Sequence, residues 1–482
     1  MPVWPLPVLW TLALGWWGIS RQDSVWRDEA ATWQAAQRSP ADIMHMLGNI
    51  DAVHGLYYLL MHECFVCFGA STTTLRLPSV LAMAVAAGCV AEVGHRLAGV
   101  WAGRGAGMVF GLLPAVQFYL QEGRPYAMVT AGAGISTLLL VTLLQAPPGA
   151  ARRRRWAAYG AAVLACGLLN WLSLLILPAH LATLAWTRAG REVWTRWLTA
   201  AVAATAGVLP LILFSRRQAQ QVAWIPPLSW QMLIGPVVLV AIGAVGAAVD
   251  RPRAGRLSAA AVGLPLLAVP QLGLVGVSVA HPLYLDRYVV FSLLGLALLV
   301  GAGLAAAVRA ATPRFPTAAP RLVPVALALA TLALLPQSLA ERSPASRVDD
   351  VVSAAADVAR MKSPGDGVVF VPTWRRDSAY VCPGDFTGLR DVALEEGPTR
   401  SGTLEGREAT PARIRAAMLA RPRILLVTDA AQAAGQAPGA RDRVKLAVLR
   451  EYFTPVADVR VRGRRVTVYE RRGPVRVDGG RT

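Results

Sequence analysis

The sequence predicts a polytopic α-helical membrane protein with about eleven transmembrane helices, one interfacial helix and a small C-terminal α/β domain. Of the 482 residues, 55% are hydrophobic and only 16% are charged, which is unusual for a soluble globular chain. Apolar segments of roughly 20 residues, the length of helix that spans a bilayer, recur from residue 4 to residue 340 and then stop. We therefore expect a membrane domain over 1–341 and an α/β domain over 342–482.

Eleven apolar segments are the expected spans: 4–20, 76–95, 104–121, 125–146, 156–170, 172–187, 197–214, 231–249, 257–280, 288–308 and 322–340. The segment 54–69 is apolar too, but it is short and carries His62 and Glu63 near its middle. We expect it to lie in the membrane interface.

Arginines in the connecting loops predict the orientation. If the N-terminus is cytoplasmic, basic loops near residues 96–104, 152–155, 188–196, 250–256 and 309–321 all lie inside, as the positive-inside rule requires. The net charge of +19 is then a feature of topology, so we expect membrane lipids as partners and no nucleic acid. Four arginines lie on the outer side instead: Arg21, Arg27, Arg216 and Arg217. Either the topology differs locally, or these arginines face an anionic ligand.

The tail has the pattern of an α/β domain. Apolar runs shorten to strand length in "GVVFVP", "RILLVTD", "VADVRV" and "RRVTVYE", and Gly463 marks a turn between the last two. Helical patterns, such as "VDDVVSAAADVARM" and "PARIRAAMLA", lie between the strands. On the orientation above, this domain is extracytoplasmic.

Polar residues gather at the outer ends of the spans rather than inside them. They are Asp28, Glu29, Asp51 and His54, then Gln121, Glu122, Arg124 and Tyr126, then His281, Tyr284, Asp286, Arg287 and Tyr288. A carboxylate can take the proton from a hydroxyl nucleophile, and arginines bind phosphate through forked hydrogen bonds. The set suits an anionic, lipid-linked substrate, and a divalent metal is compatible with these residues but not indicated by them.

Each of these residues also has an ordinary structural interpretation. An acidic pair beside a membrane helix usually caps the next helix, and arginines such as Arg124 and Arg287 usually anchor helix ends by snorkelling. Tyr126 and Tyr288 fit an aromatic belt, and His54 fits a surface or capping histidine. None of these residues indicates a catalytic site by itself.

The order of the motifs carries a family resemblance. "SVWRDEAATW", "HGLYYLLMH", "STTTLRLPSVLAMAVAAG", "HRLAGVWAGRGAGMVFGLLPAVQFYLQEGRPYAM" and "HPLYLDRYVVFSLLGLALL" follow one another between residues 4 and 310. Together they resemble the multi-pass glycosyltransferases of the GT-C superfamily. Within it, they are most similar to bacterial members of family 39, the protein O-mannosyltransferase-like group, and to the related aminoarabinose transferases.

This resemblance implies an enzyme that transfers a sugar, such as the hexose mannose, from a polyprenyl monophosphate to an acceptor hydroxyl outside the membrane. It implies that Asp28 is the general base and that Glu29 helps to position it. His54 stands where relatives often have a basic residue before prolines, which "HGLYY" replaces here. The donor-phosphate candidates are thus His54, Arg124, Tyr126, Arg287 and Tyr288.

Direct attack of the hydroxyl on the anomeric carbon predicts inversion of configuration. Neighbouring carboxylates cannot easily flank one sugar ring about 5 Å apart, so a retaining glycosidase is disfavoured. The acceptor class stays open among glycan, lipid and protein. A transporter or flippase of lipid-linked sugars is the main alternative, against which stand the scarcity of acids within the spans and the lack of evident repeats. A membrane-anchored sensor would not explain the clustered loops.

Overall fold

The computed structural model describes residues 2–146, 150–250, 256–430 and 439–472. Contacts within the chain divide it into two units. The first comprises Met1–Ile19, Asp51–Tyr57 and Thr73–Arg342, and the second comprises Ser20–Ile50, Tyr58–Thr72 and Ser343–Thr482. The second unit thus takes in much of the first outer loop together with the tail, and the domain boundary expected at 341/342 stays a prediction.

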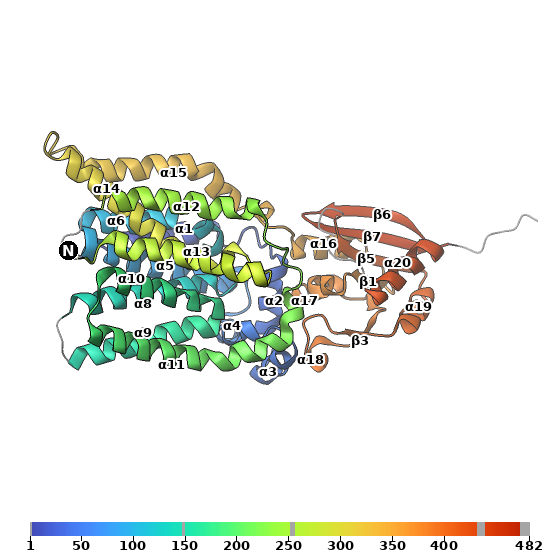
Figure 1. The fold of residues 1–482 in the computed structure, drawn as a ribbon. Helices are drawn as coiled ribbons and strands as arrows, with labels where there is room; N and C mark the ends of the chain where they lie inside the picture. Colours follow the sequence, from blue (N-terminus) through green and yellow to red (C-terminus); the bar gives the residue numbers. More distant parts are fainter. Residues whose placement is uncertain (1, 147–149, 251–255, 431–438, 473–482) are drawn as a thin grey trace, which may run out of the picture. The chain divides into compact units, whose positions relative to one another are not determined.

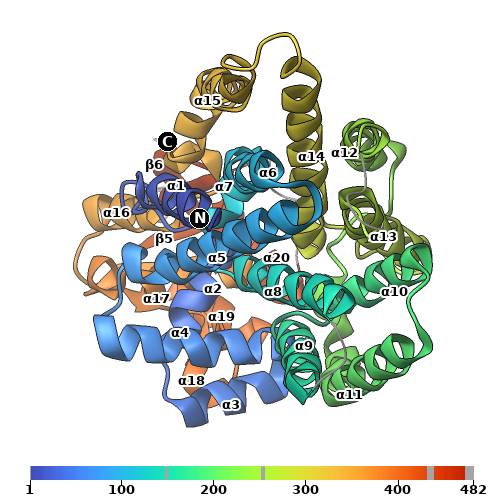
Figure 2. The same cartoon turned by 90° about the vertical axis from the view of Figure 1, so that its left-hand side faces the viewer.

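The first unit is helical, and Figure 1 shows α8, α9, α11, α12 and α13 running lengthwise beside one another. Figure 2 shows α6, α9 and α12 of this unit end on. The α-helices are α1 (Pro5–Trp16), α5 (Thr72–Ala98), α6 (Val100–Leu112), α7 (Pro114–Leu120), α8 (Tyr126–Gln145), α9 (Ala150–Leu169), α10 (Ile176–Thr187), α11 (Arg191–Ser215), α12 (Trp230–Ala248), α13 (Ala259–Ala280), α14 (Leu293–Ala311) and α15 (Leu322–Glu341). Short 3₁₀ helices are η1 (Ala52–His54), η2 (Trp171–Leu175), η3 (Arg216–Val222), η4 (Asp286–Ser292) and η5 (Ala319–Arg321).

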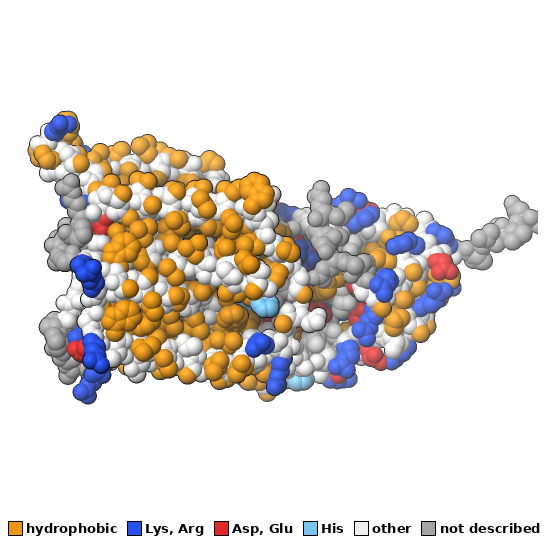
Figure 3. Space-filling view, in the orientation of Figure 1, with side chains coloured by type: hydrophobic (Ala, Val, Ile, Leu, Met, Phe, Trp, Pro, Cys, Tyr) orange, Lys and Arg blue, Asp and Glu red, His pale blue; other side chains and the backbone are white. Residues whose placement is uncertain are grey.

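Among the described residues, seven helices are long and apolar enough to cross a membrane: Thr72–Ala98, Tyr126–Gln145, Arg191–Gln221, Trp230–Ala248, Ala259–Ala280, Asp286–Ala311 and Ala319–Glu341. Hydrophobic side chains cover the face formed by α11, α12 and α13 (Figure 3). Exposed examples are Val237 and Val245 on α12 and Leu272 and Val279 on α13. A surface of this kind is stable in lipid and costly in water.

Four expected spans, 4–20, 104–121, 156–170 and 172–187, are not among these seven helices, so the number eleven is not confirmed. The segments 156–170 and 172–187 are nevertheless helical, in α9 and in η2 with α10. The segment 104–121 is divided between α6 and α7, because Pro114 excludes the α conformation at the preceding residue. Leu113 accordingly has ψ 128°. The segment 4–20 contains only the 12-residue helix α1, since Trp17 turns to an extended conformation with ψ 107°. The apolar segment 54–69 does form a helix, α4 (Gly55–Phe68).

Small residues allow the closest helix packing in this unit. A Cβ atom placed on Gly301 of α14 would lie only 2.5 Å from the backbone oxygen of Ala102 on α6. Gly105, one turn further along α6, faces the Cα of Gly301 in the same contact. Such close backbone approach is a general means of helix association in membranes, where lipid gives no hydrophobic drive between helices.

The second unit contains a five-stranded sheet with the order β2-β1-β5-β7-β6. Its strands are β1 (Gly367–Val371), β2 (Arg390–Asp391), β5 (Arg423–Asp429), β6 (Phe453–Val461) and β7 (Arg464–Arg471), with β3 (Leu394–Glu396) and β4 (Arg407–Glu408) forming a separate pair. Strand β1 is parallel to β2 and β5, whereas β7 is antiparallel to β5 and β6. The α-helices of the unit are α2 (Arg27–Ala36), α3 (Pro40–Asn49), α16 (Val351–Met361), α17 (Asp377–Val381), α18 (Pro398–Ser401), α19 (Pro411–Leu419) and α20 (Ala440–Tyr452). Its 3₁₀ helices are η6 (Pro344–Ser346), η7 (Thr373–Arg376) and η8 (Pro383–Phe386).

Alternation of apolar residues along the strands gives this sheet two buried faces. Val369 and Leu426 lie in one core with residues of α19 and α20. Val368 and Leu425 lie in the other core with residues of α16. The α/β character expected from the tail is confirmed. So is the turn at Gly463, which has φ +81° and follows Arg462 at φ +40°, as a two-residue hairpin loop requires.

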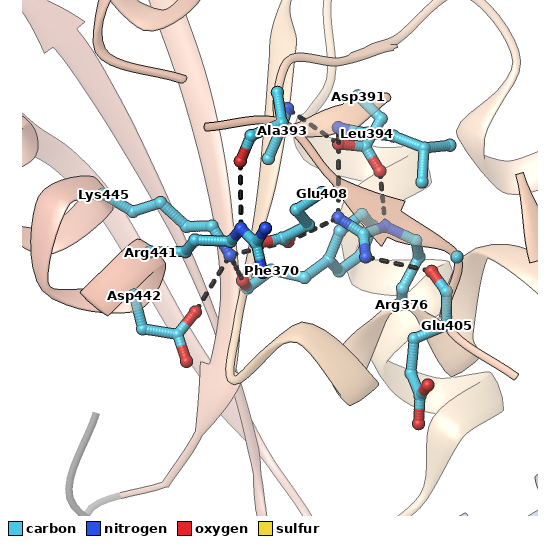
Figure 4. A network of polar contacts seen from close by, with 12 residues as sticks. Phe370, Arg376, Asp391, Ala393, Leu394, Glu405, Glu408, Arg441, Asp442 and Lys445 are labelled. Atoms are coloured by element: carbon cyan, nitrogen blue, oxygen red, sulfur yellow. Dashed lines mark hydrogen bonds and ion pairs between the residues drawn. The ribbon is translucent and has the colours of Figure 1, made fainter. Parts of the chain in front are cut away.

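A buried ionic network lies between the sheet and α20 (Figure 4). The Lys445 Nζ donates to Oε1 of Glu408 at 2.7 Å, to Oδ1 of Asp442 at 2.9 Å and to the backbone oxygen of Phe370 at 2.8 Å. Arg376 donates to the same Glu408 at 2.8 Å. Since a buried cation is tolerated only with such partners, the network fixes α20 against the sheet.

Candidate functional site

The predicted donor-phosphate residues of the first unit form two contacting groups. In the first group, Nη2 of Arg124 lies 3.1 Å from Nε2 of His54. In the second, Cζ of Arg287 lies 5.8 Å from the ring centre of Tyr126 and 5.7 Å from that of Tyr288. The structure thus brings His54 to Arg124, and Tyr126 to Arg287 and its neighbour Tyr288, from segments far apart in sequence.

The loop that carries Arg124 is held at several points. Nε2 of Gln121 donates to the backbone oxygens of Gly15 and Trp17 at 2.9 and 2.8 Å, which satisfies carbonyls at the end of α1. The hydroxyl of Ser79, on α5, donates to the backbone oxygen of Glu122 at 2.5 Å. These bonds hold the buried Arg124 on a fixed backbone.

His54 lies between a cation and a carboxylate. Its Nδ1 is 3.4 Å from Oδ1 of Asp51, which precedes it by three residues. Burial, and then the neighbouring Arg124, lower the pKa of His54 below its usual value, although Asp51 opposes this shift. The imidazole is therefore neutral near pH 7, and Arg124 keeps its charge beside it.

Arg287 lies among three aromatic rings, one of which the sequence analysis missed. Its Cζ lies 5.6 Å from the ring centre of Trp224, which lies between the expected spans 197–214 and 231–249. Trp224 follows the polar run at 215–221, but Val222, Ala223 and Ile225 beside it are apolar, so no local pattern singles it out. The backbone N–H of Arg287 donates to Oδ1 of Asp286 at 2.8 Å, and the Tyr119 hydroxyl donates to the same oxygen at 3.3 Å. Aromatic faces stabilise a guanidinium and fix its plane.

The segment Asp51–His54 is fixed by the loop that follows α11. Oε1 of Gln221 accepts from the backbone N–H of Asp51 at 3.1 Å, and Oε1 of Gln218 accepts from that of Ala52 at 2.9 Å. Asp51 itself has the left-handed conformation, with φ +60°. The 3₁₀ helix η3 therefore has a structural role in placing His54, which the sequence analysis did not predict.

The acidic pair lies in the second unit, in the first turn of α2. Glu29 is fully buried, and its Oε1 accepts from Nη2 of Arg21 at 3.0 Å, with both side chains 0% exposed. Asp28 is partly exposed. The negative charges at the start of a helix interact favourably with its dipole.

A left-handed turn precedes this helix. Arg21, Gln22 and Asp23 have φ values of +48°, +55° and +57°. Non-glycine residues in this conformation cost roughly 1–2 kcal/mol each, so the turn needs support. The Arg21–Glu29 pair supplies part of it, and the Thr72 hydroxyl supplies another by donating to Oδ1 of Asp23 at 2.9 Å.

Two of the arginines that the orientation left unexplained have carboxylate partners in the protein. Arg21 pairs with Glu29, and Nε of Arg27 donates to Oδ2 of Asp349 at 3.0 Å. Arg217 instead lies over the ring of Phe214, with Cζ 5.9 Å from its centre. The sequence offered only a locally different topology or an anionic ligand, because partners so distant along the chain leave no local pattern.

A cavity of about 730 Å³ is lined by apolar residues of α1, α5 and α8 together with Glu92 and His95, and it contains none of the predicted site residues. Within the ranges that the structure describes, no three His, Cys, Asp or Glu side chains are grouped so that they could hold a metal ion.

Comparisons with known proteins identify the fold. No protein-family model matches the chain, and no curated protein matches its sequence. Among solved structures, ArnT from Cupriavidus metallidurans is similar in the apo state, with a TM-score of 0.63, 14% identity, and coverage of 96% of this chain and 97% of that one. ArnT bound to undecaprenyl phosphate gives a TM-score of 0.62, 15% identity and the same coverage.

A second similar structure comes from another domain of life. The archaeal oligosaccharyltransferase AglB from Archaeoglobus fulgidus, in complex with an inhibitory peptide and a dolichol-phosphate, gives a TM-score of 0.52 at 11% identity, covering 98% of this chain and 74% of that one. Both neighbours are membrane glycosyltransferases of the GT-C superfamily. The chain therefore has the GT-C fold, as its motifs predicted.

Proposed function

We propose that this chain is an integral membrane glycosyltransferase that moves a sugar from a polyprenyl monophosphate to an acceptor hydroxyl on the outer face of the membrane. The observation that carries the proposal is the pair of arginines, Arg124 and Arg287, held by His54 and by an aromatic cluster in a chain with the GT-C fold. Solved structures with this fold bind undecaprenyl phosphate or a dolichol-phosphate.

In the proposed reaction, Asp28 accepts the proton of the acceptor hydroxyl. The hydroxyl oxygen then attacks the anomeric carbon of the donor sugar, and the bond from that carbon to the phosphate oxygen breaks with its electrons on the phosphate. The products are an inverted glycoside, a polyprenyl phosphate and a protonated Asp28. Arg124 and Arg287 neutralise the leaving phosphate, which needs charge stabilisation more than protonation.

The roles of the other residues follow from their contacts. Neutral His54 accepts from Arg124 and orients it, while Tyr126 and Tyr288 fix the plane of Arg287. Glu29, through its buried pair with Arg21, holds the first turn of α2 in shape. A hexose such as mannose is the proposed sugar, and a glycan, lipid or protein is the proposed acceptor.

The test compares wild type with Asp28→Asn in membranes supplied with radiolabelled polyprenyl-phosphate sugars. Loss of a general base lowers the transfer rate by about 10²–10⁴-fold, so we expect transfer to the acceptor fraction to fall by that factor. Asp42→Asn is the matched control, since Asp42 also lies in the first turn of a helix in the first outer loop. We expect this control to keep wild-type activity.

Unchanged transfer by Asp28→Asn would refute the role of Asp28. A wild-type protein that carries the labelled lipid across vesicles without forming a glycoside would instead favour the transporter alternative.

A further inference from the structure

We infer that the C-terminal tail positions Asp28 through Asp349, which makes Asp349 a positioning residue for the proposed reaction. The inference rests on the proposed function. Oδ1 of Asp349 accepts from the backbone N–H of Arg27 at 3.0 Å, and Oδ2 accepts from Nε of the same residue at 3.0 Å. Arg27 is the first residue of α2, and Asp28 is the next residue.

Asp349 takes the place of a missing helix cap. The first N–H groups of a helix have no partner within it, and a Ser, Thr, Asp or Asn side chain usually accepts from them. The N-cap residue of α2 is Trp26, whose side chain makes no such bond. A carboxylate 322 residues away in the sequence does so instead, so the start of α2 depends on the tail.

The capping carboxylate is itself rigidly held. Nε of Arg464 on β7 donates to Oδ2 of Asp349 at 3.1 Å, and its two terminal nitrogens donate to Asp377 at 2.9 and 2.6 Å. Burial by itself raises the pKa of Asp349, but Arg464, Arg27 and Arg375 outweigh burial, so the pKa lies below its ordinary value. The carboxylate therefore stays charged at neutral pH and ties α2 to a strand of the sheet.

Apolar packing adds a second connection between the same segments. Val25 and Ala30 share a buried cluster with Val351 and Val381 of the tail. The backbone N–H of Val351 donates to the backbone oxygen of Val25 at 2.8 Å. With contacts on both sides of Arg27, the first turn of α2 has one orientation, and so has the backbone that carries Asp28.

Catalysis by a general base depends on placement to within a fraction of an ångström. Removing the cap should therefore loosen Asp28 and lower kcat, while donor binding depends on residues of the first unit. A fall in kcat without a rise in the KM for the donor therefore distinguishes a positioning role from a purely structural one.

The experiment compares Asp349→Ala with Asp442→Ala, which removes one carboxylate from the buried Lys445 network in the same tail (Figure 4). We expect Asp349→Ala to lower kcat at least tenfold and to change the KM for the lipid donor less than twofold. Asp349→Asn, which keeps an acceptor oxygen for the Arg27 N–H, should restore part of the loss. Asp442→Ala should keep kcat within twofold of wild type, even if it lowers the melting temperature as much as Asp349→Ala does.

Equal loss of kcat in the two alanine variants, or a loss explained by the fraction of folded protein, would overturn the inference. If Asp349→Ala does not fold, Arg27→Ala removes the Nε bond to Asp349 and keeps the backbone N–H bond, so kcat should fall, by a smaller factor. This side chain is 32% exposed, so the change should be tolerated. If wild type transfers no sugar, the proposed function fails, but hydrogen exchange still tests the link. Amides at 27–31 should then exchange faster in Asp349→Ala than in Asp442→Ala, and equal exchange would refute it.

Discussion

Nη2 of Arg124 lies 3.1 Å from Nε2 of His54. A guanidinium has no acceptor, so the imidazole nitrogen must accept, which places the ring proton on Nδ1. Oδ1 of Asp51 lies 3.4 Å from this nitrogen. The contact with Arg124 requires a neutral imidazole, so it is lost when His54 is protonated at low pH.

We predict that stability falls on acidification because of His54. Its folded pKa lies below the ordinary value of 6.5, so the unfolded chain takes up a proton first as the pH falls. The stabilisation is fully present above about pH 6.5 and is lost below it, with a slope of at most about 1.4 kcal/mol per pH unit. Thermal melting of purified protein between pH 5 and 8 measures this effect.

His54→Gln is the matched variant, since its side-chain oxygen can still accept from Arg124. Its melting temperature should vary less between pH 5 and 6.5 than that of wild type. Parallel curves for the two proteins would show that His54 does not titrate as described.

We predict that Arg287→Lys weakens donor binding although it keeps the charge. Arg287 lies among the rings of Tyr126, Trp224 and Tyr288, and an ammonium cannot stack on them as a planar guanidinium does. Each such contact is worth about 0.5–2 kcal/mol, so the KM for the polyprenyl-phosphate sugar should rise about tenfold. Binding of undecaprenyl phosphate to the purified protein gives a second measure.

Tyr288→Phe serves as the control, because it keeps the ring and removes only the hydroxyl. It should bind the donor within about twofold of wild type. If Arg287→Lys also binds as wild type does, charge alone suffices and the aromatic cluster has no part in the site.

The parts of the fold that the sequence predicted are those encoded locally. The hairpin of β6 and β7 follows from two apolar strand patterns and Gly463, all within about twenty residues. The break at Pro114 is equally local, but the apolar pattern continues through it, so the sequence predicts one span over 104–121 where the structure has two helices.

The site contains both residues that the sequence predicts and residues that it does not. Arg124 and Arg287 were found because each lies at the end of an apolar span. Asp349 and Trp224 were not, because their importance comes from partners far along the chain, Arg27 and Arg287. A sequence pattern records neither the burial nor the partner of such residues.

We predict that Arg342→Ala strongly destabilises the first unit. Arg342 follows α15, and its guanidinium donates to the backbone oxygens of Leu14 and Trp17 at 2.6 and 2.9 Å and to Oε1 of Gln117 at 2.9 Å. Its Cζ also lies 4.1 Å from the ring centre of Trp17. The same guanidinium also donates to the backbone oxygen of Ser338 at 2.5 Å, so the variant loses four bonds of a buried cation. This loss should cost about 4 kcal/mol, measured as a fall in the melting temperature.

Arg309→Ala removes an exposed arginine from the end of α14 and should change stability by less than about 0.5 kcal/mol. Arg342→Lys should recover little of the loss, since one ammonium cannot reach acceptors spread around a fork. Full recovery by lysine would mean that charge, rather than the fork geometry, stabilises this contact.

We predict that the tail and the loop at 188–191 lie on opposite sides of the membrane. Gly384, in the tail, and Gly190, before α11, are exposed, and a Cβ atom added at either would have no other atom within 4 Å. Single cysteines at these positions, in a chain whose five native cysteines are replaced, should therefore fold normally and react with a maleimide.

A membrane-impermeant maleimide should label Gly384→Cys in intact cells and Gly190→Cys only after the membrane is opened, because the loop at 188–191 is basic and the positive-inside rule puts it in the cytoplasm. Labelling both cysteines in detergent controls for reactivity. The reverse pattern in intact cells would invert the whole orientation, and it would place Arg124 and Arg287 on the cytoplasmic side. Labelling of both cysteines in intact cells would put both on the outside. The chain between them would then cross the membrane an even number of times, so an odd number of the predicted spans between residues 190 and 384 would be wrong.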